Sequence, residues 1–207
     1  MRAILLSLLI AVIGYLLGCF STGITISKAQ GVDIRSKGSK NTGATNVLRV
    51  LGVKSGVATF LGDIIKASLA VWIGYAILPG ATFGIERYGM MLGGLAAIIG
   101  HNWPVFYGFK GGKGVACSAA VIFFVDTLCA LPAIAAAILI IAVTRFISVG
   151  SMTLLGVFLI VVAIVRWGNW ALFVLALILF VLCVWRHRAN IGRLIKGTEN
   201  KLGQKAK

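Results

Sequence analysis

Long apolar runs alternate with short polar segments along the whole chain. Continuous runs of about 20 apolar residues fit a bilayer as α-helices, and these runs are too long and too little alternating for barrel strands. Pro132 separates the fourth run from the fifth, because proline disrupts a helix interior. The pattern predicts an all-α polytopic membrane protein with seven transmembrane helices, over residues 3–26, 55–78, 88–106, 114–131, 132–147, 150–165 and 169–185.

The composition agrees with a membrane protein. Of the 207 residues, 59% are hydrophobic and 12% are charged, whereas a soluble domain carries about 25% charged residues. We expect a single integral membrane domain over residues 1–207, with no separate soluble domain. The first residues resemble a weak signal peptide, but one cation precedes the run and no small-x-small site follows it, so we expect this run to be retained as a span.

The net charge of +15 would suggest nucleic acid in a soluble protein, but here the cations stand between apolar runs, so we expect no nucleic-acid partner. Sixteen cations lie near the ends of the first, third, fifth and seventh runs: Lys28, Arg35, Lys37, Lys40, Arg49, Lys54, Lys110, Lys113, Arg145, Arg186, Arg188, Arg193, Lys196, Lys201, Lys205 and Lys207. Three lie at the opposite ends (Arg2, Arg87, Arg166), and Lys66 lies within a run. The positive-inside rule predicts an outside N-terminus and a cytoplasmic C-terminus, which requires seven crossings.

The segment 100–116 has an unusual composition for a span, with four glycines and two lysines between positions 108 and 114. Each glycine costs about 1 kcal/mol of helix propensity, so a cluster of them indicates a sharp turn or a close approach of the backbone. Backbone N–H groups beside lysines form a site for an anion such as phosphate. We expect Lys110, Gly111, Gly112, Lys113 and Gly114 to contribute to it, and His101 to shape the loop rather than take a proton.

The loop 27–54 is dense in hydroxyl and amide side chains around residues 38–46. If a helix begins near Thr45, Arg49 lies one turn further on and can point back towards its N-terminus. Hydroxyls, amides and a guanidinium suit the oxygens of a phosphate. A solvated, turn-rich loop is the alternative explanation for Ser39, Asn41, Thr45, Asn46 and Arg49.

The tail begins with Arg186-His187-Arg188, where the last run ends. On a continuous helix His187, Asn190 and Leu194 share one face, and Arg186 and Arg193 lie on another. Neighbouring cations favour a neutral imidazole, which can accept a proton or a hydrogen bond. Simple anchoring explains the arginines equally well, but it does not require His187 or Asn190.

Two further groups belong to the cationic side. Asp63 and Lys66 are three residues apart within the second run, a spacing at which the charges neutralise each other, and we expect a structural pair. Arg145 and Ser148, in the turn after the fifth run, supply either another cation and hydroxyl for substrate or an anchor.

Several kinds of chemistry are absent from the sequence. It has neither a Walker A loop nor a G-x-G-x-x-G motif. Its five acids provide neither a catalytic carboxylate pair nor a magnesium cage on the cationic side, and its four cysteines form no C-x-x-C pair. We expect no metal and no cofactor, so the substrate must already be activated.

Three stretches together resemble the signature motifs of one family: GSKNTGATNVLR at 38–49, GHNWPVFYGFKGGKGVA at 100–116 and RHRANIGRLIKGTE at 186–199. The chain is similar over its whole length to the bacterial acyl-phosphate:glycerol-3-phosphate acyltransferases of the PlsY type. Two positions depart from the family pattern, which generally has Gly where Lys40 stands and favours Thr where Cys117 stands.

The resemblance implies transfer of a fatty acyl group from acyl phosphate to the 1-hydroxyl of glycerol 3-phosphate, giving lysophosphatidic acid and phosphate, the first committed step of bacterial phospholipid synthesis. It implies a multi-pass protein of the bacterial inner membrane with a cytoplasmic active site, and a soluble acyl-phosphate-producing acyltransferase (PlsX type) as partner. The residue chemistry agrees, because both substrates carry phosphate, the acyl chain needs the bilayer, and acyl phosphate has a good leaving group.

Roles follow from this resemblance as hypotheses. Segment 107–114 would cradle the acyl phosphate with Lys113 neutralising the leaving phosphate, and His187 with Asn190 would orient glycerol 3-phosphate. We assign catalysis to Ser39, Arg49, Lys113, His187 and Asn190. We assign substrate binding to Asn41, Thr45, Asn46, Lys110, Gly111, Gly112, Gly114, Arg145 and Ser148. We assign structural or secondary roles to His101, Asp63, Lys66 and Glu199.

Some alternatives stay open on the sequence alone. The proton of the attacking hydroxyl goes to His187 or to a phosphate oxygen of the substrate, and the few carboxylates favour the substrate. A transporter of a phosphate compound would place polar groups near the midplane in paired repeats, which this sequence does not show. A docking scaffold would not need His101, His187 or the glycines.

Overall fold

The computed structural model describes residues 1–204, so Lys205 and Lys207 of the sequence charge count lie outside the described residues. In this part of the chain the regular elements are helices, as the apolar runs predict. They are α1 (Arg2–Cys19), α2 (Thr22–Ala29), α3 (Ala44–Leu51), α4 (Val53–Ile77), α5 (Tyr88–Asn102), the 3-10 helix η1 (Val105–Tyr107), α6 (Val115–Val125), α7 (Thr127–Thr144), α8 (Ile147–Val165), α9 (Trp170–Arg186) and α10 (Arg188–Ile195).

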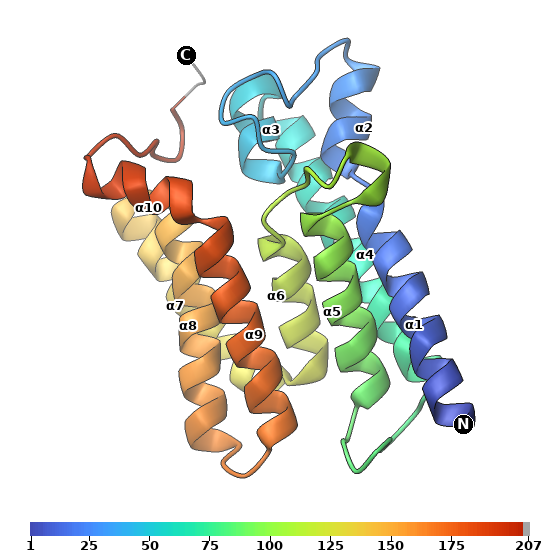
Figure 1. Cartoon of the computed structure of the whole chain (residues 1–207). Coiled ribbons are helices and arrows are strands. Elements are labelled where there is room, and N and C mark those ends of the chain that lie inside the picture. Colours follow the sequence, from blue (N-terminus) through green and yellow to red (C-terminus); the bar gives the residue numbers. More distant parts are fainter. Residues whose placement is uncertain (205–207) are drawn as a thin grey trace. The chain divides into compact units, whose positions relative to one another are not determined.

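The helices form two compact units, Met1–Val125 and Asp126–Gln204. In the first unit α1 packs against α5 and α4, and α4 also packs against α3, α5 and α6 (Figure 1). Glycines bring these helix backbones together, because a Cβ on Gly18 would collide with the Ala97 carbonyl and one on Gly100 with the Tyr15 carbonyl. Small residues at such crossings are typical of helix packing in membranes.

The second unit is built on two hairpins, with α7 against α8 and α8 against α9 (Figure 1). A Cβ on Gly150 would meet the Ile141 side chain, so glycine again permits a close crossing of α7 and α8. At the start of α7, Arg166 Nε donates to Asp126 Oδ2 at 2.7 Å. This ion pair connects the two ends of the α7–α8 hairpin.

The boundary expected at Pro132 is wrong. Pro132 lies inside α7, and the break between α6 and α7 is at Asp126. The Asp126 carboxylate accepts the N–H of Cys129 and so caps α7, which is a strong start signal for a helix. Proline in the second turn still leaves most of α7 intact, so the fourth helix is shorter than expected and the fifth is longer.

Four helical segments are long and apolar enough to cross a membrane: Arg2–Ala29, Val53–Ile77, Thr127–Thr144 and Ile147–Val165. The pair α9 and α10 makes a fifth if its 57° bend is counted within one span. Helix α5 has 15 residues and α6 has 11, fewer than the ~20 that span a bilayer. The seven crossings and the sidedness of the termini therefore stay predictions.

Large apolar side chains cover the outer surfaces of the long helices, among them Leu5, Leu8, Ile65, Ile138, Leu139, Val143, Ile160 and Ile164. A water-soluble protein rarely exposes so much contiguous apolar surface. These positions are suited to contact with lipid, in agreement with an integral membrane protein.

Candidate functional site

Asn46 organises the first polar loop. Its side chain is 1% exposed, and its Oδ1 accepts the N–H of Ser39 at 2.8 Å. Its Nδ2 lies 2.8, 3.1 and 3.4 Å from the carbonyls of Asn41, Lys37 and Ile34. Both polar atoms of the Asn46 amide therefore bond the loop backbone and shape the loop, while the substrate contact expected from the sequence stays a prediction.

The loop leads directly into α3, which begins at Ala44 after Gly43 as N-cap, one residue before the expected start. The Asn41 carboxamide accepts the N–H of Gly43 at 2.9 Å and closes the turn. Thr45 and Arg49 are four residues apart on α3, so they are neighbours on one face, and both are partly exposed. Ser39 precedes this turn and is exposed.

Lys40 has a backbone φ of 59°, in the left-handed region. Glycine occupies this region readily, whereas a residue with a Cβ pays about 1 kcal/mol or more. This geometry explains why a glycine at this position suits the motif. In this chain the loop keeps its turn, with the N–H of Lys40 donating to the Lys37 carbonyl, and gains an exposed cation next to Ser39.

The glycines of the second segment are needed for packing as much as for binding. The N–H of Gly111 donates to the Asn102 carbonyl at 3.3 Å, and that of Gly112 donates to the His101 carbonyl at 3.0 Å. These bonds satisfy carbonyls at the C-terminal end of α5, which helix geometry leaves without partners. Both N–H groups are thus used at the end of α5, and their expected role in cradling a phosphate stays a prediction.

The anion donors that this segment still offers lie further along. Gly114, with φ of 76°, turns the chain into α6, and the first amides of α6 point out of the helix without intrahelical acceptors. Lys113 is partly exposed just before this turn, and Lys110 is exposed on the loop. A helix N-terminus with a lysine beside it suits a phosphate.

The first two segments share a small core. Ile24, Ile34 and Val47 are buried together, and Tyr107 of the second segment packs against them. Ile34 comes from the first loop, Val47 from α3, and Tyr107 from η1. The structure therefore brings the first and second polar segments side by side, far apart though they are in sequence.

Asn102 is a residue that the sequence argument left without a role. Its side chain is fully buried, and neither amide atom has a hydrogen-bond partner among the described residues. A Cβ on Gly114 would lie 2.9 Å from Asn102 Oδ1, so the amide faces the turn that starts α6. An unsatisfied buried amide is costly, and its place beside Gly114 is the signal that identifies it.

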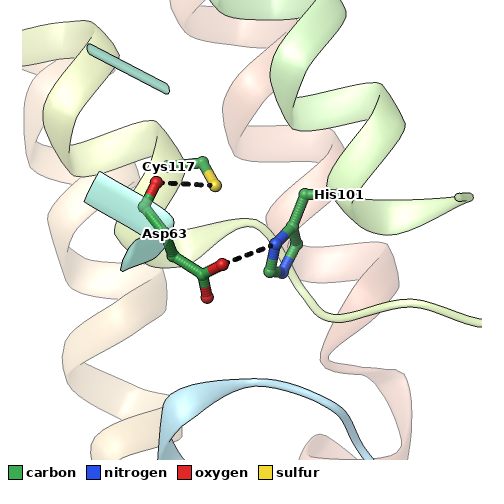
Figure 2. A group of neighbouring side chains, drawn as sticks. All are labelled: Asp63, His101 and Cys117. Carbon is green, nitrogen blue, oxygen red and sulfur yellow. Dashed lines mark hydrogen bonds and ion pairs between the residues drawn. The ribbon is translucent and has the colours of Figure 1, made fainter. Parts of the chain in front are cut away.

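Asp63 and Lys66 form the expected ion pair, with Lys66 Nζ 2.9 Å from Asp63 Oδ1. Their partner is the second polar segment, since Lys66 Nζ also lies 3.0 Å from Nδ1 of His101. Figure 2 shows Asp63 and His101 facing each other, with Cys117 above the Asp63 backbone. All four side chains are buried.

In the second unit Glu199 is the centre of a buried network. Its Oε1 accepts from Ser148 Oγ at 2.9 Å and from Asn190 Nδ2 at 2.5 Å, and its Oε2 accepts from Arg193 Nε at 2.6 Å. Burial alone would raise the pKa of Glu199, but hydrogen bonds from Asn190, Arg193 and Ser148 hold that pKa below its usual value. Glu199 thus fixes two residues that the sequence assigned to catalysis and binding.

His187 lies where α9 meets α10 at a 57° bend, which separates Arg186 from the residues of α10. The N–H of Ile191 donates to the His187 carbonyl at 2.9 Å, so helical backbone continues from His187 through Leu194. Its Nδ1 is 2.8 Å from the Cys183 carbonyl, and a carbonyl only accepts, so Nδ1 carries the proton. In the neutral ring Nε2 is then the acceptor atom. His187 is 2% exposed.

Arg145 connects the α7–α8 turn to the tail. It has φ of 62°, its guanidinium donates to the Leu202 carbonyl at 2.8 Å, and its own carbonyl accepts from the Leu202 N–H at 2.7 Å. Part of its donor capacity therefore holds the tail, which favours the anchoring alternative.

The family profile described as "Glycerol-3-phosphate acyltransferase" matches residues 8–197. The glycerol-3-phosphate acyltransferase of Thermoanaerobacter sp. (strain X514) is 44% identical over 200 residues, covering 96% of this chain and 97% of the relative. That of Clostridioides difficile (strain 630) is 43% identical over 203 residues, covering 96% of each.

Solved structures are similar as well. The crystal structure of PlsY (YgiH), an integral membrane glycerol 3-phosphate acyltransferase, in its glycerol 3-phosphate form has a TM-score of 0.86 and 37% identity, covering 95% of this chain and 96% of that chain. The lysophosphatidic acid form has a TM-score of 0.82 and 36% identity, covering 95% of each.

Proposed function

Because the chain belongs to the family of integral membrane glycerol-3-phosphate acyltransferases of the PlsY type, we propose that it uses acyl phosphate as donor. The 1-hydroxyl of glycerol 3-phosphate attacks the acyl carbon, the bond from that carbon to the phosphate oxygen breaks, and lysophosphatidic acid and inorganic phosphate are released. The acceptor and product forms of the similar structure support this acceptor and this product.

One observation carries the choice of an activated donor. Four of the five acids are held in ion pairs: Asp33 with Arg35, Asp63 with Lys66, Asp126 with Arg166 and Glu199 with Arg193. The fifth, Glu86, follows the second apolar run, on the side predicted to face away from the motifs. A thermodynamically activated acyl phosphate does not require a carboxylate nucleophile or base.

Phosphate binding in the first unit rests on cations and helix ends. Lys113 and the first turn of α6 would neutralise the leaving phosphate, and Ser39 with Arg49 would bind phosphate oxygens from the first loop. The shared core of Ile24, Ile34, Val47 and Tyr107 supports a combined role for the two segments. Charge neutralisation at the leaving oxygen is the main catalytic term in this scheme.

Glycerol 3-phosphate would be oriented by His187 and Asn190 in the second unit. Since the Asn190 amide nitrogen donates to Glu199, its Oδ1 is the atom suited to accept a glycerol hydroxyl. His187 Nε2 would accept a second hydroxyl. Because Nδ1 of His187 donates to a neutral carbonyl and not to a carboxylate that would stabilise an imidazolium, the attacking hydroxyl's proton goes to a substrate phosphate oxygen.

The proposal extends to topology and location. The unequal distribution of cations supports seven crossings, an outside N-terminus and an active site at the cytoplasmic face of a bacterial inner membrane. On that face a soluble enzyme of the PlsX type would supply acyl phosphate. A donor that reaches the site from the bilayer would keep its acyl chain in lipid throughout.

The test is acyl transfer by the purified protein in detergent. Phosphate release should require acyl phosphate and glycerol 3-phosphate together, and Arg49→Ala should lower kcat/KM by 100-fold or more, about 3 kcal/mol, without lowering the unfolding temperature. Lys54, near the start of α4, offers a control, since Lys54→Ala removes a nearby cation outside the motif. Full activity of Arg49→Ala would overturn the assignment of the first loop.

A further inference from the structure

A buried cluster next to the second polar segment contains more ionisable side chains than a structural ion pair needs. Asp63 and Lys66 lie on α4, His101 near the end of α5 and Cys117 on α6 (Figure 2). Asp63, Lys66 and His101 are 3%, 5% and 7% exposed. A buried charged group is costly unless it is paired and hydrogen-bonded, so the arrangement requires a function.

The three contacts of the Lys66 ammonium indicate the protonation state of His101. Nζ lies 2.7 Å from the Phe20 carbonyl, 2.9 Å from Asp63 Oδ1 and 3.0 Å from His101 Nδ1. Nδ1 of His101 also lies 3.4 Å from Asp63 Oδ1, the contact drawn in Figure 2. The contact with the ammonium is shorter, and an ammonium only donates, so we assign Nδ1 as the acceptor and place the proton of the neutral ring on Nε2. A charged ring would place two buried cations 3.0 Å apart against one carboxylate, an arrangement that burial strongly disfavours.

Lys66 argues against a metal site in this cluster. Asp63, His101 and Cys117 each offer one ligand atom, all within 4.8 Å of one another. The ammonium of Lys66, however, contacts one carboxylate oxygen of Asp63 and Nδ1 of His101, and the Cys117 thiol lies 3.4 Å from the Asp63 carbonyl. The cation of this cluster is Lys66.

The other side of His101 supports the backbone of the second segment. A Cβ added to Gly112 would collide with the imidazole at Nε2, and one added to Gly111 would collide with the His101 carbonyl. The N–H of Gly112 donates to that carbonyl at 3.0 Å. The ring and backbone of His101 therefore pack directly against Gly111 and Gly112, the two residues that precede Lys113.

The geometry points to Asp63, Lys66 and His101 as positioning residues for substrate phosphate. The ion pair fixes the ring of His101 as its Nε2–H tautomer. The ring in turn sets the backbone path of Gly111 and Gly112, and this path orients Lys113 and the N-terminus of α6 towards the phosphate. This inference rests on the proposed function, because it assumes that the segment binds a substrate phosphate. Lys66 adds a tie to Phe20, whose carbonyl lies at the break between α1 and α2.

A double-mutant cycle tests the contact. Gly112→Ala should raise the KM of one phosphate-bearing substrate about tenfold and lower kcat less than about threefold, because the Cβ displaces the segment without removing a reacting group. His101→Ala should have a similar effect, and the double variant should be no worse than His101→Ala, since the Cβ enters the space left by the ring. A wild-type KM in Gly112→Ala, or multiplicative losses in the double variant, would overturn the proposal.

Asp126→Asn is the control, because it weakens the ion pair of another buried carboxylate, in the second unit, whose partner Arg166 is partly exposed. It should lower the unfolding temperature and leave both KM values within about twofold of wild type. An equal rise of KM in this control would show that KM responds to general loss of stability, and would contradict a positioning role.

Histidine-¹⁵N NMR of the detergent-solubilised protein tests the tautomer without any activity. The chain has two histidines, and His187→Gln assigns them. His101 should be protonated at Nε2 and His187 at Nδ1. Protonation of His101 at Nδ1, or at both nitrogens, would overturn the proposal even in an active enzyme, whereas the expected tautomer in an enzyme inactive with acyl phosphate would leave the network standing and remove the proposed function.

Discussion

Two substitutions of Glu199 remove different hydrogen bonds from the buried network of the second unit. Glu199→Gln keeps an oxygen for Ser148 and Asn190 but turns an amide N–H₂ group towards Arg193. Glu199→Ala removes every acceptor that this side chain offers to Asn190, Ser148 and Arg193. We expect the glutamine variant to lose the smaller amount of stability.

The magnitudes follow from the contacts. A hydrogen bond to a charged group contributes about 1.5–3 kcal/mol, but the Arg193 side chain is 33% exposed, so solvent screening reduces its share to about 1 kcal/mol or less. We expect a loss of about 2 kcal/mol for Glu199→Gln and about 3 kcal/mol for Glu199→Ala. For a chain of this size the larger loss lowers the unfolding midpoint by about 6–12 °C.

The four cysteines provide the assay, since all are free and buried. At pH 7 a thiol-reactive fluorophore reports the midpoint as unfolding exposes them. At lower pH, where the reactive thiolate is scarce, the fluorescence of the five tryptophans reports it. Because the folded pKa of Glu199 is depressed, its contribution is complete above its unfolded pKa of about 4.3 and is lost as the pH falls through the lower folded value. The difference between wild type and Glu199→Gln should be constant from pH 7 to pH 5 and shrink below about pH 4.3. Equal midpoints at pH 7, or a difference that grows on acidification, would refute this account.

Three further substitutions test individual loop positions. Asn46→Ala should cost about 3 kcal/mol and raise protease cleavage of the 34–41 loop, because the Ser39 N–H and three carbonyls lose their partner; an uncleaved loop would contradict the organising role. Lys40→Gly should raise the unfolding midpoint by about 2–4 °C by relieving the left-handed backbone, and a lower midpoint would show that the lysine is compensated elsewhere. Asn102→Leu should leave stability unchanged or higher, because two unsatisfied amide atoms disappear, while activity should fall if the amide orders a water or substrate group; wild-type activity would deny it that role.

The sequence predicted the helical membrane class and the three polar segments correctly, because long apolar runs and clustered glycine, lysine and amide residues are local signals. It placed the break at Pro132, although Asp126, six residues earlier, is a local N-cap signal whose carboxylate accepts the N–H of Cys129. It predicted the Asp63–Lys66 pair from spacing, but not its contact with His101, which needs α4 and α5 packed together.

Roles within the loops were harder to predict, because composition does not show which donors are used internally. The N–H groups of Gly111 and Gly112 satisfy the end of α5, and the amide of Asn46 satisfies its own loop. Glu199 was ranked as secondary since its three partners come from separate positions, Ser148, Asn190 and Arg193. In each case the missing information was which polar groups of the folded segment bond one another.

The most direct test of the central claim is a comparison of donors at equal concentration. Purified protein receives glycerol 3-phosphate with either acyl phosphate or the matching acyl-CoA, and lysophosphatidic acid and inorganic phosphate are measured in the same samples. The account predicts one phosphate released per lysophosphatidic acid formed from acyl phosphate, and no product from acyl-CoA. Equal product from acyl-CoA, or phosphate release that does not require glycerol 3-phosphate, would contradict it.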